Sequence, residues 1–201
     1  MYLHLSDPRL PLKTGDVIEA GTTGRIVVEK CIGSGGFSLM YLAHREGSDR
    51  YLALKELFPR QLENVIVHRS PDGRIGIFDP VSGMEVPDTD ALWQELTGYF
   101  EREARLTRLA GTVYDRQGNQ TGQNHPDVLH VDGPFRDRRG NYYLAIDTYQ
   151  GESLRDFIER GFVRSENGDV IANEFLEDIL GILTETAIRL SALHAQGLWH
   201  L

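Results

Sequence analysis

Short apolar runs separated by polar breaks dominate the first third of the chain, and this is the pattern of β-strands joined by turns. Residues 25–32 (RIVVEKCI), 39–44 (LMYLAH) and 51–57 (YLALKEL) are rich in β-branched or alternating apolar residues. Glycine, serine and aspartate fill the breaks. Three strands at this spacing predict an antiparallel meander rather than alternating strands and helices. Residues 1–24, rich in proline, glycine and threonine, predict a lead-in with at most one short strand.

A long segment, residues 58–89, separates the third strand from the first helical pattern. It holds two β-rich runs, VIVHR and RIGIF, on either side of Ser-Pro-Asp-Gly. Pro-Asp-Gly between alternating runs is a hairpin signal, so we expect an inserted β-hairpin. The insert shows no chemistry of its own. We expect a surface decoration, with a docking surface beside the following helix as the alternative.

Residues 90–110 predict the first helix, with Gly111 as its C-terminal cap. Apolar side chains recur there at steps of three and four: Leu92, Leu96, Tyr99, Leu106 and Ala110. Glu103 falls on the same stripe. The stripe is therefore predicted to pack against the sheet with a carboxylate among its members.

The second half of the chain predicts two more strands and then helices. Residues 115–124 predict a polar loop, and residues 128–131 and 141–148 predict strands joined through an arginine-rich, solvated turn. Ser153 is a candidate N-cap for a following helix. Residues 174–196 predict a long amphipathic helix closed by Gly197, with a wide apolar face.

Charge and cysteine content narrow the classes of function. The 201-residue chain has a formal net charge of −9, which argues against a nucleic-acid partner held through its phosphates. No apolar run approaches the roughly 18 residues of a membrane span, and the N-terminus lacks the pattern of a secretory signal. The single cysteine, Cys31, excludes an intrachain disulfide and favours a cytoplasmic location. The seven histidines do not show metal-ligand spacing, so no metal site is predicted.

The run CIGSGGFSLMYLA, residues 31–43, is a candidate phosphate-binding loop. A bland turn or bulge is the alternative for its glycines, Gly33, Gly35 and Gly36. A dinucleotide-binding loop needs a helix after the glycines, and a Walker loop needs Gly-Lys-Ser/Thr; neither is present. The remaining option is a flap between two strands that presents backbone N–H groups to a nucleotide's phosphates, with Phe37 at its tip excluding water.

Lys55 lies at an unusual position in the third strand. Period-two alternation puts Ala53, Lys55 and Leu57 on one face, which is otherwise apolar. An edge lysine that reaches out to solvent is one interpretation. The other is a partner carboxylate, and Glu103 on the helix stripe needs a cation because an unpaired buried carboxylate is costly. We therefore predict an ion pair between Lys55 and Glu103 that aims the ammonium at the glycine flap.

With these residues in place, the chain resembles a bacterial serine/threonine protein kinase of the eukaryotic-like type. The family's glycine loop, GxGxxGxV, corresponds to Gly33, Gly35 and Ser38, with Met40 at the valine. ALKELFP resembles the strand that carries the family's lysine, here Lys55. FEREARLTRL resembles the C helix and its glutamate, here Glu103.

The resemblance continues to residue 201. HPDVLHV resembles the element leading into the fourth strand, and YYLAIDTYQGESLRDFI resembles the fifth strand, hinge and next helix. It implies that Ile146 is the gatekeeper and that the backbone of residues 147–149 binds adenine. LSALHAQGLWHL resembles the approach to the catalytic loop, with His200 at the histidine of H-R-D and Leu201 at its arginine. The catalytic aspartate would follow Leu201. Ser38, Met40, Leu201 and the insert depart from the family's pattern, and the leucine argues against activation by loop phosphorylation.

The resemblance implies an α+β fold: a kinase N-lobe over residues 25–149, with a five-stranded antiparallel sheet, a C helix and the inserted hairpin, then an incomplete helical C-lobe over residues 150–201. It implies ATP- and Mg²⁺-dependent phosphoryl transfer to protein serine or threonine by the full-length protein. These 201 residues alone are expected to be inactive and to hold no cofactor firmly. A pseudokinase scaffold and a small-molecule kinase of the same fold are the alternatives. Nucleotide contacts are assigned by the resemblance to Ile32, Gly33, Ser34, Gly35, Gly36, Phe37, Ser38, Met40, Ala53, Lys55, Ile146, Asp147 and Tyr149.

Overall fold

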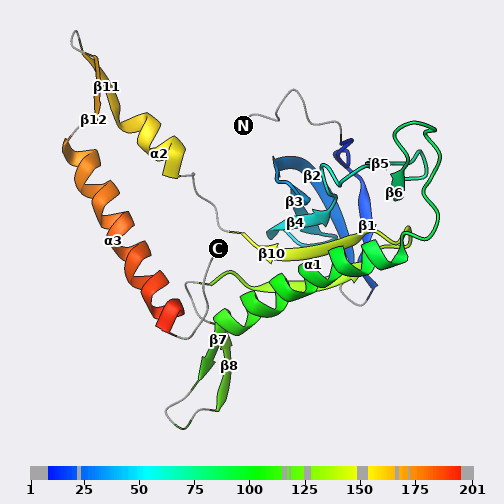
Figure 1. The fold of residues 1–201 in the computed structure, drawn as a ribbon. Coiled ribbons are helices and arrows are strands. Elements are labelled where there is room, and N and C mark those ends of the chain that lie inside the picture. The colour runs from blue at the N-terminus through cyan, green and yellow to red at the C-terminus, as the bar shows by residue number, and fades with distance from the viewer. Residues whose placement is uncertain are drawn as a thin grey trace. The chain divides into compact units, whose positions relative to one another are not determined.

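The computed structural model describes most of the chain, and its description covers residues 9–21, 24–114, 117, 119–124, 128–148, 154–165, 168–171 and 173–195. The fold is mixed α+β, with a curled antiparallel sheet (Figure 1). Contacts divide the chain into two compact units, residues 1–148 and residues 149–201.

The first unit is built on a six-stranded sheet with the order β1-β2-β3-β4-β10-β9. Its strands are β1 (Val17–Glu19), β2 (Arg25–Ser34), β3 (Ser38–Arg45), β4 (Tyr51–Leu57), β9 (Val131–Arg136) and β10 (Tyr142–Asp147). The predicted meander is present as β2, β3 and β4, each antiparallel to the next. Five strands were expected, and the sixth is β1, which pairs with β2 and makes part of the lead-in an edge of the sheet.

β9 begins at residue 131, where the predicted strand 128–131 ends. The tight turn before β10 explains the shift. Oδ1 of Asp137 accepts hydrogen bonds from the backbone N–H groups of Arg139 and Asn141, both at 2.9 Å. Such a turn fixes hairpin register, so the strands pair from the turn outward. Arg136, Arg138 and Arg139 are exposed on and beside this turn, as predicted.

The two faces of the sheet bury two sets of apolar side chains. On one face, Tyr41, Leu54 and Tyr143 join a large cluster, here called the first core. On the opposite face, Leu57 and Leu144 join a smaller cluster with a helix, here called the helix core. β4 contributes Leu52 and Leu54 to the first core and Leu57 to the helix core, so this strand is covered on both sides.

The insert forms the expected hairpin, with strands β5 (Ile66–Arg69) and β6 (Ile75–Phe78). Val67, Ile75 and Ile77 are buried in the first core, on the face of the sheet opposite the helix core. The expectation of a surface decoration is therefore wrong, because the hairpin supplies part of the core. Gly73 in its turn has φ of +89°, a conformation that a side chain would strain.

Helix α1 (Asp90–Gly111) packs against β4 and β9, but not through the predicted stripe. Its buried residues are Leu96, Thr97, Phe100, Ala104 and Gly111. Tyr99 is 61% exposed and Leu106 is 38% exposed, so their predicted burial is wrong. The polar Thr97 fits on the buried face because its hydroxyl donates to the Trp93 carbonyl at 2.8 Å. The true stripe is therefore rotated from the predicted one.

A second hairpin follows α1, with strands β7 (Thr112–Tyr114) and β8 (Gln120–Asn124). The prediction of a polar loop over 115–124 is therefore wrong for the strand β8, whose polar residues carry no apolar alternation. Antiparallel backbone pairing forms this hairpin with no apolar face to guide it.

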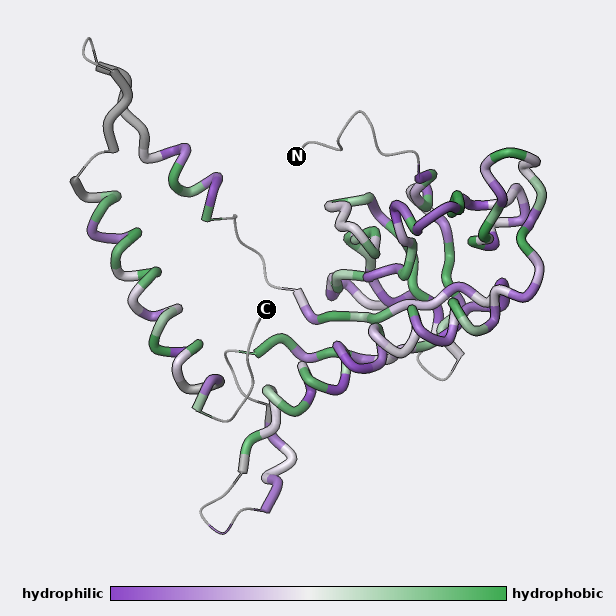
Figure 2. The backbone as a smooth tube through the Cα atoms, viewed as in Figure 1, coloured by the Kyte–Doolittle hydropathy of each residue, from purple (hydrophilic) through white to green (hydrophobic). Residues whose placement is uncertain are grey.

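The second unit contains α2 (Leu154–Gly161), a hairpin of β11 (Phe162–Ser165) and β12 (Gly168–Ile171), and α3 (Asn173–Ala195). The hairpin was not predicted, whereas α3 matches the predicted helix 174–196 to within one residue at each end. Leu180 and Ile188 of α3 are 54% and 57% exposed, and Figure 2 shows hydrophobic and hydrophilic positions alternating along the helix. Ser153, Gly197, His200 and Leu201 lie outside the described residues.

Candidate functional site

The glycine run forms a loop between two strands. β2 ends at Ser34 and β3 begins at Ser38, and the N–H of Gly35 donates to the carbonyl of Ser38 at 2.9 Å. Phe37 is 60% exposed, whereas Ser38 is buried. Among the described residues, positive φ angles at non-glycine positions occur at Asn64 and Asp88, so Ser38 carries its side chain without backbone strain.

The carbonyl groups of this loop are bound from one side. The carbonyl of Phe37 accepts from the N–H of Phe58 at 3.0 Å, and that of Gly36 accepts from the N–H of Arg60 at 2.7 Å. The carbonyl of Gly35 accepts from the guanidinium of Arg9 at 2.9 Å. In a trans peptide the N–H points away from the carbonyl. The N–H groups of Gly36 and Phe37 therefore face away from Arg9 and from the segment after β4.

Lys55 and Glu103 are in contact. Nζ of Lys55 lies 2.5 Å and 2.6 Å from the two carboxylate oxygens of Glu103, and 5.6 Å from the centre of the Phe100 ring. The side chains are 19% and 46% exposed. Glu103 lies beside the packed stripe of α1, not on it. This ion pair is therefore open to solvent on the helix side, where such pairs contribute about 0–1 kcal/mol to stability.

Strand register places several of the predicted nucleotide contacts on one face. Met40 is the cross-strand partner of Lys55, and Ile146 is the partner of Ala53. Directly opposed residues share a face of a sheet, so all four side chains lie on the face that α1 covers. Gly33 opposes Met40 from β2, and Ile32 lies at an irregularity in the same pairing. Ser34 is exposed at the end of β2.

The predicted hinge is described in part. Asp147 is exposed, and its backbone N–H donates to the carbonyl of His130 at 2.9 Å. That N–H is engaged within the fold, so the carbonyl is the backbone group of Asp147 that remains to bind a nucleobase. Tyr149 lies outside the described residues.

A cavity of about 710 Å³ lies away from the glycine loop. The start of α1, the exit of the insert and the turn between β9 and β10 line it, with Trp93, Asp88, Arg139 and Tyr142 among the contributors. In the part of the chain that the structure describes, no three His, Cys, Asp or Glu side chains are grouped to hold a metal ion. Cys31 packs against the first core, and its Sγ lies 3.5 Å from the Gly33 carbonyl.

Sequence reasoning missed a buried carboxylate next to Lys55. Glu56 is fully buried. Its Oε2 accepts from Tyr41 Oη at 2.7 Å and from Arg69 at 2.6 Å, and its Oε1 accepts from Tyr143 Oη at 2.9 Å. The sequence did contain a signal for it. The period-two alternation that marks Lys55 as unusual also places Glu56 on the same face of the strand as Leu52 and Leu54.

The surroundings of Glu56 keep its partners protonated. Burial raises the pKa of Tyr41 and of Tyr143 well above the ordinary value, and the negative charge of Glu56 raises both further. Burial lowers the pKa of Arg69, but the Glu56 carboxylate and the two tyrosines together raise it above its ordinary value. The carboxylate is thus held by one cation and two hydroxyl donors.

Comparison with known proteins supports the fold and goes no further. No protein-family model matches the sequence, and no curated protein matches it. A solved structure described as the apo form of PpkA-294 superposes with a TM-score of 0.51 at 23% identity. The match covers 75% of this chain and 43% of that one, so the chain spans less than half the length of PpkA-294. The likeness shows a fold compatible with a kinase-like N-lobe. Within the described residues, no helix is both long enough and apolar enough to cross a bilayer.

Proposed function

We propose that this chain is the N-terminal part of a bacterial serine/threonine protein kinase, which transfers the γ-phosphoryl group of ATP to protein hydroxyl groups. One observation carries the proposal. The ammonium of Lys55 is held by both carboxylate oxygens of Glu103, on the same sheet face as Met40, Ala53 and Ile146 and across from the strand that leaves the glycine loop. The fold shared with PpkA-294 supports the same proposal.

Each group has a part in holding ATP. Lys55 would pair with phosphate oxygens, and Glu103 would orient the ammonium, since phosphoryl transfer depends on positioning and charge stabilisation. The outward N–H groups of Gly36 and Phe37 would bind phosphate oxygens, a role open to them because the carbonyls face the other way.

The apolar face beside Lys55 fits a nucleobase. Ala53 is small and buried, Met40 and Ile146 are half-buried on the same face, and Ile32 is half-buried on β2. These four side chains would cover the face of adenine, while the carbonyl of Asp147 and the backbone of Tyr149 would bind its edge.

Among the described residues, no three His, Cys, Asp or Glu side chains are grouped to hold the Mg²⁺ that the proposal requires. Mg²⁺ requires several oxygen ligands, and the Glu103 carboxylate is already bound to Lys55. Under the proposal the metal ligands and the catalytic base follow Leu201. Under the proposal the kinase is cytoplasmic, which agrees with the single cysteine of the chain.

The test uses the full-length protein and the variant Lys55→Met. Calorimetry should show ATP binding to the wild-type protein, and radiolabelled ATP should label a serine or threonine acceptor. Lys55→Met should lower the transfer rate by about 10²–10³-fold, the usual cost of removing one charge-stabilising group. The proposal fails if the wild-type protein does not bind ATP, or if the variant transfers phosphate at the wild-type rate.

The same experiment separates the alternatives. Binding of ATP with no transfer to any acceptor identifies a pseudokinase. Transfer to aminoglycosides or choline, with no transfer to protein, identifies a small-molecule kinase.

A further inference from the structure

Arg9 is a buried cation that contacts both the glycine loop and the chain after β4. The residue is 4% exposed. Its guanidinium donates to the carbonyls of Phe58 at 2.5 Å, Gly35 at 2.9 Å and Ser38 at 3.3 Å. A planar guanidinium with five donors can bind several carbonyls at fixed angles, which a lysine ammonium on a flexible stem cannot reproduce. Arg9 therefore bridges the two ends of the loop to residue 58.

Phe58 joins this contact to the insert. The ring is fully buried, with the guanidinium carbon of Arg9 5.9 Å and that of Arg69 5.2 Å from its centre. Its backbone N–H also donates to the carbonyl of Phe37 in the loop. Phe58 thus connects the loop, the N-terminal segment and the hairpin.

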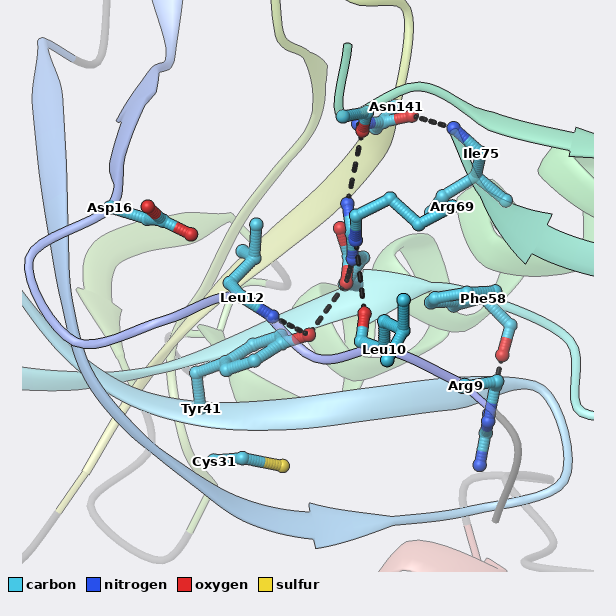
Figure 3. Close-up of polar contacts among 12 residues, drawn as sticks. Arg9, Leu10, Leu12, Asp16, Cys31, Tyr41, Phe58, Arg69, Ile75 and Asn141 are labelled. Carbon is cyan, nitrogen blue, oxygen red and sulfur yellow. Dashed lines mark hydrogen bonds and ion pairs between the residues drawn. The ribbon is translucent and has the colours of Figure 1, made fainter. Parts of the chain in front are cut away.

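The segment that carries Arg9 is itself anchored, as Figure 3 shows. Nε of Arg69 donates to the carbonyl of Leu10 at 3.0 Å, and the N–H of Leu12 donates to Tyr41 Oη at 3.2 Å. Both anchors also donate to Glu56. Residues 9–12 are therefore fixed to the residue that follows Lys55 on β4.

We propose that Arg9 is a positioning residue that holds the glycine loop at a fixed place relative to Lys55, with Arg69 and Glu56 anchoring the segment that carries it. The proposal concerns nucleotide binding at the site proposed above and rests on that function. Three carbonyls of the loop point toward Arg9 and the segment after β4, and this fixes the direction of the Gly36 and Phe37 N–H groups. Loss of Arg9 releases that constraint without removing any group that touches the nucleotide.

The experiment compares Arg9→Ala and Arg9→Lys with the matched control Val67→Ala in the full-length protein. Val67 is buried in the same first core and makes its contacts through the hairpin, so its truncation weakens the core without removing a bond to the loop. Amide hydrogen exchange reports the loop directly, since the N–H groups of Gly35, Phe58 and Arg60 are bonded to or within it.

Arg9→Ala should speed exchange at those three amides by about 10-fold or more relative to Val67→Ala. It should raise KM for ATP about 10-fold with kcat changed less than about threefold, the signature of lost ground-state binding. Arg9→Lys should fall between the wild type and Arg9→Ala in both measurements, and it serves alone if Arg9→Ala does not fold.

Equal exchange at the three amides in Arg9→Ala and Val67→Ala overturns the proposal, as does an equal rise in KM. Wild-type exchange and KM in Arg9→Lys overturn it too, because they show that a cation without the guanidinium fork suffices. The exchange measurement needs no nucleotide. A wild-type protein that fails to bind ATP therefore overturns the proposed function, while the exchange data still decide whether Arg9 holds the loop.

Discussion

Lys55 and Glu56 are neighbours on β4, and each forms an ion pair on its own face of the sheet. Lys55 pairs with Glu103 of α1, whose side chain is 46% exposed. Glu56 pairs with Arg69 of the insert; the Glu56 side chain is fully buried and that of Arg69 is 9% exposed. Two tyrosine hydroxyls complete the shell of Glu56, whereas Glu103 faces water on one side.

The difference in burial means that the two ion pairs contribute differently to the stability of the fold. An exposed pair gains little because water competes for both charges, so it can form and break at small cost. A buried carboxylate that loses its cation keeps the cost of desolvation with nothing to offset it. The Glu56 pair is thus suited to fix structure, whereas the Lys55 pair can rearrange at small cost.

The largest expected effect is that of Arg69→Met. It leaves Glu56 buried without its cation and should lower the free energy of unfolding by about 3–5 kcal/mol, measured by urea denaturation. The double variant Glu56→Gln/Arg69→Met should recover part of the loss, since the uncompensated charge is gone. If Arg69→Met lowers the free energy of unfolding no more than Lys55→Met does, the difference in burial does not make the Glu56 pair the more stabilising one.

Tyr143→Phe should follow in size. It removes the hydroxyl that lies 2.9 Å from the Glu56 carboxylate and 3.4 Å from the Asp137 carboxylate, and it keeps the ring. The expected loss is about 1.5–3 kcal/mol in the same unfolding assay. Tyr142→Phe on the neighbouring, half-buried position is the control and should change stability little. Equal losses in the two variants would mean that the Glu56 shell contributes no more than an ordinary tyrosine.

Alkaline pH should gradually lower the stability that Tyr41 and Tyr143 contribute through their hydrogen bonds to Glu56. The folded-state pKa values of Tyr41 and Tyr143 are raised by burial and by Glu56, so both stay protonated when unfolded tyrosines ionise. Their stabilisation is complete below the unfolded value of about 10, and above it stability falls by roughly 1.4 kcal/mol per pH unit for each tyrosine. Unfolding curves at successive pH values should show a shallower slope in Tyr143→Phe. An unchanged slope would contradict the proposed effect of burial.

The smallest expected effect on stability is that of Lys55→Met, within about 1 kcal/mol. Thermal unfolding of the wild type and the variant checks it, with the exposed pair Arg25–Glu46 as a reference through Arg25→Met. A loss of stability as large as that of Arg69→Met would show that Lys55 stabilises the fold in addition to its proposed role in the site.

Much of this arrangement was predictable from the sequence, where local pattern and tertiary packing agree. Alternation located β2, β3 and β4, the Pro-Asp-Gly turn located the insert, and apolar periodicity located α3. The same alternation led to the contact between Lys55 and Glu103, although their roles in phosphoryl transfer stay predictions.

The remaining features depend on contacts that no local pattern encodes. The buried face of α1 uses Thr97, whose hydroxyl is satisfied by its own helix, and this polar residue hid the true stripe. The polar strand β8 has no apolar face to reveal it. Arg69 reaches Glu56 only because the hairpin folds back over the sheet, which neither sequence segment shows by itself.

The insert also changes the entropic cost of bringing α1 into contact with β4. Residues 58–89 separate the strand of Lys55 from the helix of Glu103, and an unstructured connection of that length would have to be closed against chain entropy. The hairpin instead packs as a unit, and Leu57 and Asp90, at its two borders, line the same cavity. Shortening the insert to a plain loop would therefore remove side chains of the first core, and not merely surplus chain. The folded hairpin is a rigid connection that sets where α1 begins.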